Sequence, residues 1–246
     1  MSETTINESV PLPGARAGRD PQRAIKRGPS RVPPEVVAAT QRDRLFDGLV
    51  HTVAAKGYAN ARVSDICQAA GVTRPAFYAL FDGKDEAFLL TYRHGTGVLL
   101  KLMEQAYGDA RTTGDWRRAT RAALRVLLDV LAGVPAFATM AIVEIEAVGP
   151  AARAERNALL RRFDQFFAEA PGPALPGELV GAIVGGIYAT IYRYVASGRV
   201  TELPDLLPVV SYFTMVPFLG REEAARELVT PPPEGPPATA PCTFSQ

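Results

Sequence analysis

The sequence predicts an all-α protein with two domains, and three observations support this fold class. Apolar residues recur at intervals of three and four positions in one segment after another, as they do on one face of an α-helix. Gly or Pro separates these segments where helices commonly begin and end. No segment shows the alternation of apolar and polar residues that is typical of a strand. The length of 246 residues is enough for two modest domains.

The chain is expected to begin with an unstructured segment and one long helix. Residues 1–33 are rich in Pro, Gly and Arg and lack apolar periodicity, so we expect a flexible basic arm. A helical pattern then runs from Glu35 to Lys56, and Gly57 supplies its stop.

Two short helices are expected next, over residues 63–70 and 74–80. Gly71 would end the first in the left-handed conformation, and Thr73 would cap the second. Two short helices around one glycine are typical of a helix-turn-helix. Ile66, Ala69, Val72, Phe77 and Phe81 can face inward, which leaves the opposite face of the second short helix free.

The remainder reads as longer helices, for which we expect the spans 85–107, 115–131, 135–148, 151–168, 178–197 and 204–218. The division that follows is a disordered basic arm at 1–33, a helix-turn-helix domain at 34–84, a second helical domain at 85–220 and a disordered Pro-rich tail at 221–246.

Composition narrows the class of protein. Apolar residues make up 47% of the chain and charged residues 22%, an ordinary globular balance. Gly, Pro or charge interrupts every apolar run before the roughly 20 residues of a bilayer span, and no signal sequence is visible, so we expect a cytoplasmic protein without a membrane partner. Cys67 and Cys242 form no disulfide or metal pattern, and no cofactor is expected.

Charge is distributed unevenly along the chain. The net charge is only +1, but residues 9–80 hold eleven basic and five acidic side chains, a local charge of +6. This asymmetry favours a polyanionic partner for the first third of the chain. A solvated basic surface without a partner would give the same count.

The stretch around the two short helices resembles the DNA-binding signature of the TetR family. The elements of that signature occur here in order and at the family's spacing, as Gly57-Tyr58, Asp65-Ile66-Cys67, Ala70-Gly71-Val72-Thr73, Phe77-Tyr78, Phe81 and Lys84-Asp85-Glu86. The signature covers about residues 40–90, and the number of helices up to about residue 220 agrees with the family fold.

The resemblance implies a set of residues that contact double-stranded DNA. Ser64 and Thr73 would act as phosphate-facing caps, Arg74 and Tyr78 would lie on the reading face, and Lys84 would hold a phosphate. Pro75 and Ala76, in the same helix turn, are also expected to contact DNA. Arg74 contacting only backbone, or Lys84 pairing with a surface carboxylate, are the alternatives.

Three positions depart from the family pattern. Pro75 stands where a small residue is common, and Ala79 and Leu80 replace side chains that are often polar. The reading face is therefore poor in hydrogen-bonding groups. The basic arm before Pro33 would compensate by following phosphates or a minor groove, unless it only solubilises the protein.

The second domain is expected to form a homodimer and bind a ligand. Wide apolar stripes over 178–197 and 204–218, with Gly181, Gly185 and Gly186, fit the dimer bundle that the resemblance implies, although an internal core has the same stripe. Aromatic, Met and acidic side chains suited to lining a pocket for an apolar effector are Met103, Tyr107, Phe137, Met140, Glu144, Phe163, Phe167, Tyr188 and Tyr192.

The sequence thus predicts a TetR-type regulator, a repressor that binds a palindromic operator as a dimer and is released by a small apolar effector. An activator, and a DNA-binding dimer with no effector, remain alternatives. We expect no enzyme, since His51 and His94 lack metal-spaced partners and no nucleophile or phosphate-loop motif is present.

Overall fold

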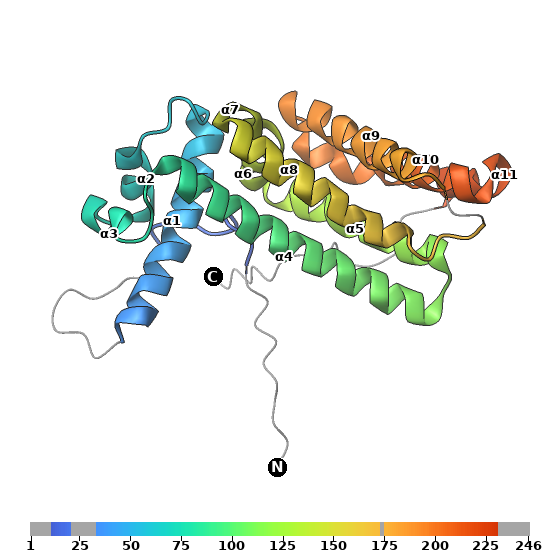
Figure 1. The fold of residues 1–246 in the computed structure, drawn as a ribbon, viewed down its shortest axis with the longest axis horizontal. Helices are drawn as coiled ribbons and strands as arrows, with labels where there is room; N and C mark the ends of the chain where they lie inside the picture. The colour runs from blue at the N-terminus through green and yellow to red at the C-terminus, as the bar shows by residue number, and fades with distance from the viewer. Residues whose placement is uncertain (1–10, 21–32, 173–174, 231–246) are drawn as a thin grey trace, which may run out of the picture.

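The computed structural model describes residues 11–20, 33–172 and 175–230. In these ranges all regular structure is helical. The molecule is elongated, with the first three helices gathered at one end and the remaining helices stacked along the rest of its length (Figure 1). The elements before the fifth helix are α1 (Pro34–Lys56), α2 (Val63–Ala70), α3 (Arg74–Tyr78) and α4 (Lys84–Thr113).

The second domain contains the remaining elements. They are α5 (Trp116–Gly133), α6 (Pro135–Ala138), the π-helix η2 (Thr139–Glu144), α7 (Ile145–Val148), α8 (Pro150–Arg162), the 3₁₀-helix η3 (Phe163–Phe167), α9 (Gly177–Ala196), the 3₁₀-helix η4 (Val200–Leu206), α10 (Leu207–Leu219), α11 (Arg221–Ala224) and α12 (Arg226–Val229). We call α1–α3 the small domain and the elements from α5 on the large domain. α4 runs from the small domain along the large one and packs against α5.

Residues at the helix ends explain why α1, α2 and α3 form where the sequence predicts them. Pro34 occupies the first turn of α1, where no amide donor is needed. Gly71 ends α2 at φ +61°, the left-handed region that glycine enters without a Cβ clash. The Thr73 hydroxyl accepts the Ala76 N–H at 3.4 Å and caps α3.

Residues 11–20 are more ordered than the sequence suggested. Residues 11–20 were predicted to belong to a flexible arm, but Leu12 is buried and the Gly14 N–H donates to Asp47 on α1 at 2.8 Å. The Arg44 guanidinium donates to the Gly18 carbonyl at 3.1 Å. The rest of the predicted arm, residues 1–10 and 21–32, lies outside the described residues.

The predicted disordered tail was wrong for its first ten residues. Helices α11 and α12 occupy most of 221–230 because the Glu227 carboxylate, 2% exposed, accepts from Arg121 at 2.6 Å and lies 3.4 Å from Arg117. A buried ion pair of this kind is invisible in the composition of the segment. Residues 231–246 of the predicted tail lie outside the described residues.

Several other boundaries differ from the prediction. α4 continues through Gly108 to Thr113, and the single helix expected over 135–148 contains the π-helical turn η2. Close packing explains one constraint on α4: a Cβ at Gly95 would lie 2.2 Å from the ring of Phe137, so α4 and α6 can approach only at glycine.

Among the described residues, two helical stretches are long and apolar enough to cross a membrane, judged by length and composition alone. They are Gly177–Ala196 and Val200–Ala224, with mean hydropathies of 1.4 and 1.3, and the bent pair α5 and α6–α7 qualifies only as a broken span. The sequence analysis expected none, because it required uninterrupted apolar runs. A mean over the whole helix tolerates single Gly, Pro and charged residues.

Candidate functional site

The helix-turn-helix presents one polar, exposed face. Ile66, Phe77 and Phe81 are buried and hold α2 and α3 against α1 and α4. This leaves Arg74 and Tyr78 pointing away from the core, and the Tyr78 side chain is 52% exposed. A short helix that buries one face and exposes Arg and Tyr on the other suits contact with a DNA groove.

The structure places most of the predicted DNA-contact residues on this face. Thr73, Arg74, Pro75 and Tyr78 are exposed, and Ala76 is half-buried beside them. Ser64 is exposed in the first turn of α2, but it is not the cap: Arg62 precedes the helix, and its N–H donates to Asp65 at 3.1 Å.

Lys84 lies at the start of α4 and contacts protein carbonyls. Its Nζ donates to the carbonyl oxygens of Tyr58 at 2.8 Å and Ala61 at 3.1 Å, and lies 4.0 Å from the centre of the Tyr58 ring. The turn between α1 and α2 is thereby tied to α4. An ammonium has three donors, so one N–H is left for another acceptor such as a phosphate.

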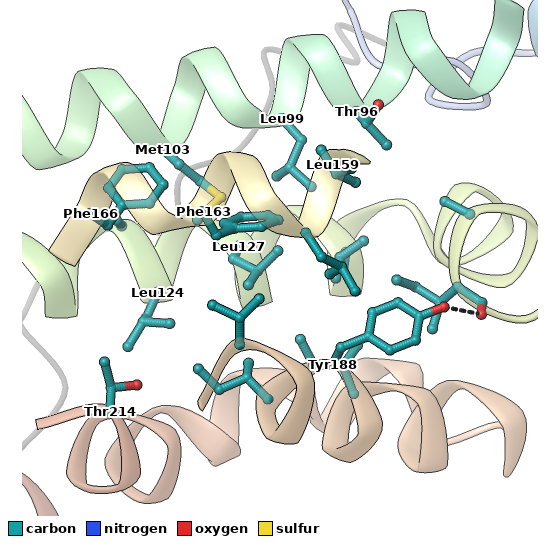
Figure 2. Close-up of a pocket in the computed structure, with 18 of the residues that line it drawn as sticks. Thr96, Leu99, Met103, Leu124, Leu127, Leu159, Phe163, Phe166, Tyr188 and Thr214 are labelled. Carbon is teal, nitrogen blue, oxygen red and sulfur yellow. Dashed lines mark hydrogen bonds between the residues drawn. The ribbon is translucent and has the colours of Figure 1, made fainter. Parts of the chain in front are cut away.

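A second candidate site is an internal cavity of the large domain. It encloses about 840 Å³ of empty space, counting the part that opens to solvent, and lies among α4, α5, η2, α8, η3, α9 and α10 (Figure 2). Within the described part of the chain, no charged side chain lines it. Such a wall suits an uncharged, apolar ligand.

The cavity is closed on one side and reachable on the other. The lining residues from α4 and α5 are all buried. The half-buried lining residues come only from η2, α8, η3 and α9, and they are Ile142, Leu159, Leu160, Phe163, Phe167 and Tyr188. A ligand would therefore enter on the α8–α9 side, with α4 and α5 as the floor.

Five of the nine predicted pocket residues line this cavity: Met103, Phe137, Phe163, Phe167 and Tyr188. The other four do not. Tyr107 packs on Phe166 and approaches Glu169 through its hydroxyl at 3.4 Å, Met140 is buried in the core, and Tyr192 is exposed on α9. Glu144 points at the small domain.

The sequence analysis missed the aliphatic and threonine part of the wall. On α5, Thr120, Ala123, Leu124, Leu127 and Leu131 line the cavity. Their spacing of three and four positions marks one face of a helix, but the same spacing describes any core helix, so it carries no sign of a cavity.

Most polar groups of the wall are bonded within the protein. The hydroxyls of Thr96 and Thr214 each donate to the carbonyl four residues earlier, at 2.7 Å. The Tyr188 hydroxyl donates to the Ile142 carbonyl at 3.0 Å, the dashed line in Figure 2. Burial raises the pKa of Tyr188 to about 12, so it stays a neutral donor at physiological pH.

Glu144 joins the two domains at the end of η2. Its Oε2 accepts the Tyr58 N–H at 2.6 Å, just after α1. The Tyr58 hydroxyl in turn bonds Asp85 on α4, and burial followed by this bond raises the pKa of Tyr58. Because Ala141 and Ile142 of η2 line the cavity, one π-helical turn contacts both the cavity and the turn that Lys84 holds.

Known proteins match the chain in its sequence and in its fold. The family model described as "Bacterial regulatory proteins, tetR family" matches residues 45–89, which span the helix-turn-helix. No curated protein matches the chain at a significant level.

Two solved structures share the fold of both domains. The fatty acid degradation regulator FadR from Bacillus halodurans superposes with a TM-score of 0.65 at 20% identity, over 78% of this chain and 97% of that one. The transcriptional regulator FadR from Bacillus subtilis, solved in complex with stearoyl-CoA, gives 0.61 at 19% identity, over 72% and 97%. The chain thus matches the TetR family model across its helix-turn-helix and shares the fold of these two FadR regulators.

Proposed function

We propose that the protein is a dimeric repressor that binds a palindromic operator and is released by an effector with a long apolar chain, of the acyl-CoA class. The observation that carries this proposal is the uncharged cavity, whose wall includes the π-helical turn that bonds the DNA-binding domain through Glu144. No catalytic step is part of the proposal, and the protein would act in the cytoplasm, where the operator is.

The effector class follows from the cavity and from a relative. The Bacillus subtilis FadR that shares the fold was solved with stearoyl-CoA. Here an acyl chain suits the apolar wall, while the charged CoA part would stay outside, since burying a phosphate without partners is costly. Arg161 and Arg162 are exposed at the end of α8, between the lining residues Leu160 and Phe163 in the sequence.

The dimer would form through the outer faces of α9 and α10. Leu179 and Tyr192 on α9 and Val209 and Phe213 on α10 are exposed, between 36% and 54%. Only 28% of the apolar window of α9 is buried in the isolated chain. Apolar helices left uncovered in this way need a partner, and a second copy packed about a two-fold axis supplies it. The alternative is that a lipid bilayer covers these apolar faces.

Release would follow from a change in the link between the domains. A chain in the cavity would bind one arrangement of η2 more tightly than the other, and η2 holds Tyr58 through Glu144. An effector shifts an equilibrium only by its difference in affinity for the two states. The spacing of the two recognition helices would then no longer match the groove repeat of about 34 Å.

Selection of genomic fragments by the purified protein across a salt series tests the DNA-binding part. We expect an enriched palindrome whose affinity falls steeply with salt. Stearoyl-CoA should release the enriched fragment and free CoA should not. A palindrome that stearoyl-CoA leaves bound would remove the effector class and keep the regulator. An effector that tightens binding would favour the activator alternative.

A further inference from the structure

Thr120 lines the cavity and carries a buried hydroxyl that is unpaired among the described residues. The residue is 3% exposed, lines the cavity from α5, and its Oγ1 has no hydrogen-bond partner among the described residues. A buried hydroxyl without a partner costs about 1–3 kcal/mol.

Other buried threonines in this protein avoid that cost in the same way. Thr91, Thr96 and Thr214 each donate to the carbonyl oxygen four residues earlier, at 2.7 Å. Thr120 lies within α5 and has such a carbonyl available at Trp116, yet it makes no such bond. Its hydroxyl is therefore left for a group that is not part of the described chain.

The other unbonded hydroxyl of the wall has charged surroundings. Tyr92 has no hydrogen bond in the described residues, but Arg156, Glu155 and Tyr188 act on it electrostatically, and burial raises its pKa. Thr120 precedes Leu124 by one helical turn on α5, and Figure 2 shows Leu124, Phe166 and Thr214 toward one end of the cavity and Tyr188 toward the other.

We propose that Thr120 hydrogen-bonds an oxygen carried on the chain of the effector, so that the protein prefers an oxygenated acyl chain, bearing a hydroxyl or keto group, to a plain saturated one. This inference rests on the proposed function, because it requires an acyl chain in the cavity. The hydroxyl can donate to a keto group and can donate to or accept from a hydroxyl. A plain methylene would leave it unpaired.

Titration with matched CoA thioesters tests the inference. Each pair has one medium or long saturated chain and the same chain with a terminal hydroxyl, and the series of lengths moves the oxygen along the cavity. At one length we expect the native protein to bind the hydroxylated ester about 2 to 10 times more tightly, the worth of one net hydrogen bond. Thr120→Val, of nearly equal size, should abolish this preference.

Two control variants separate the hydroxyl of Thr120 from general effects on folding. Ser211→Ala removes another buried, unpartnered hydroxyl that does not line the cavity. Thr214→Val removes a lining hydroxyl that is already bonded to Val210. Both should keep the preference.

Two results would overturn the inference. If saturated esters bind and the hydroxylated ones are never preferred, or if Thr120→Val keeps the preference, Thr120 does not read an oxygen and the proposed effector class still stands. If no ester of either kind binds, both fail together, and operator selection still reports on the regulator.

Discussion

At the scale of single residues, Arg74 offers the most direct test of the reading face. It is exposed on α3 and forms no hydrogen bond within the described chain. Arg74→Ala should lower operator affinity by about 1–3 kcal/mol, roughly 5 to 150-fold, and leave the melting temperature unchanged. Fluorescence anisotropy with the operator measures this. Arg221→Ala, an equally exposed arginine on α11, should change nothing.

His94 makes stability depend on pH. Its ring centre lies 5.3 Å from that of Phe46. Burial lowers the pKa of His94 below 6.5, although the negative charges of Asp43 and Asp47 act to raise it. The unfolded chain takes up the proton first, so the free energy of unfolding should fall as the pH drops below 6.5. Urea titrations above and below that pH should show a smaller fall in His94→Gln. An equal fall in the native protein and in His94→Gln would mean that another group causes the pH dependence.

The exposure of a side chain was predictable where a motif fixes its helix face, and its contacts were obscure where only the residue type was known. Arg74 and Tyr78 follow from the helix-turn-helix spacing, and the structure exposes both. Glu144 was read as a possible ligand group, but it bonds Tyr58, 86 positions earlier in the chain. Helical periodicity gives the face of one helix. It does not say which distant segment that face meets.

At the scale of elements, η2 is the feature to test, because this one π-helical turn connects the cavity to the helix-turn-helix. Glu144→Ala removes a charge-assisted bond of about 1.5–3 kcal/mol. We expect the weakening of operator binding by stearoyl-CoA to shrink about 10-fold, while binding without effector changes little. Glu146→Ala, which breaks the ion pair between Glu146 on α7 and Arg156 on α8, is the control. Equal responses in both variants would exclude the link.

The C-terminal helices α11 and α12 give a second test at this scale. Glu227→Ala would leave Arg121, 12% exposed, without its buried partner and should destabilise the protein by about 3 kcal/mol in urea unfolding. Glu223→Ala breaks the surface pair with Arg226 and should cost less than 1 kcal/mol. Similar losses of stability in the two variants would mean that the ion pair of Glu227 does not hold α12 against α5.

Elements were predicted well where their ends carry local signals and poorly where tertiary contacts decide. α2 has the predicted bounds because Gly71 ends it. Residues 11–20 look like a Pro- and Gly-containing arm and residues 221–230 like a charged tail, and they are ordered by contacts with Asp47 and Glu227. Neither carboxylate differs, in sequence, from an ordinary surface residue.

At the scale of the whole molecule, the uncovered face of α9 and α10 predicts the oligomer. Val209 is 54% exposed on α10, and Val209→Glu should turn the dimer into a monomer in sedimentation experiments without detergent. Val229→Glu, at an 81% exposed position on α12, should leave the dimer intact. A native protein that needs detergent to stay in solution would instead favour the membrane as the cover.

α9 has its inner and outer faces committed to different tasks. Val184, Ile187 and Ile191 line the cavity, while Leu179 and Tyr192 face outward to the proposed second copy. A shift of α9 therefore changes both the cavity and the proposed dimer interface. Because coupling between two binding events is reciprocal, effector binding and dimer formation must alter each other's equilibrium constant by the same factor. Diluting the protein until its subunits separate should thus change how tightly it holds its effector.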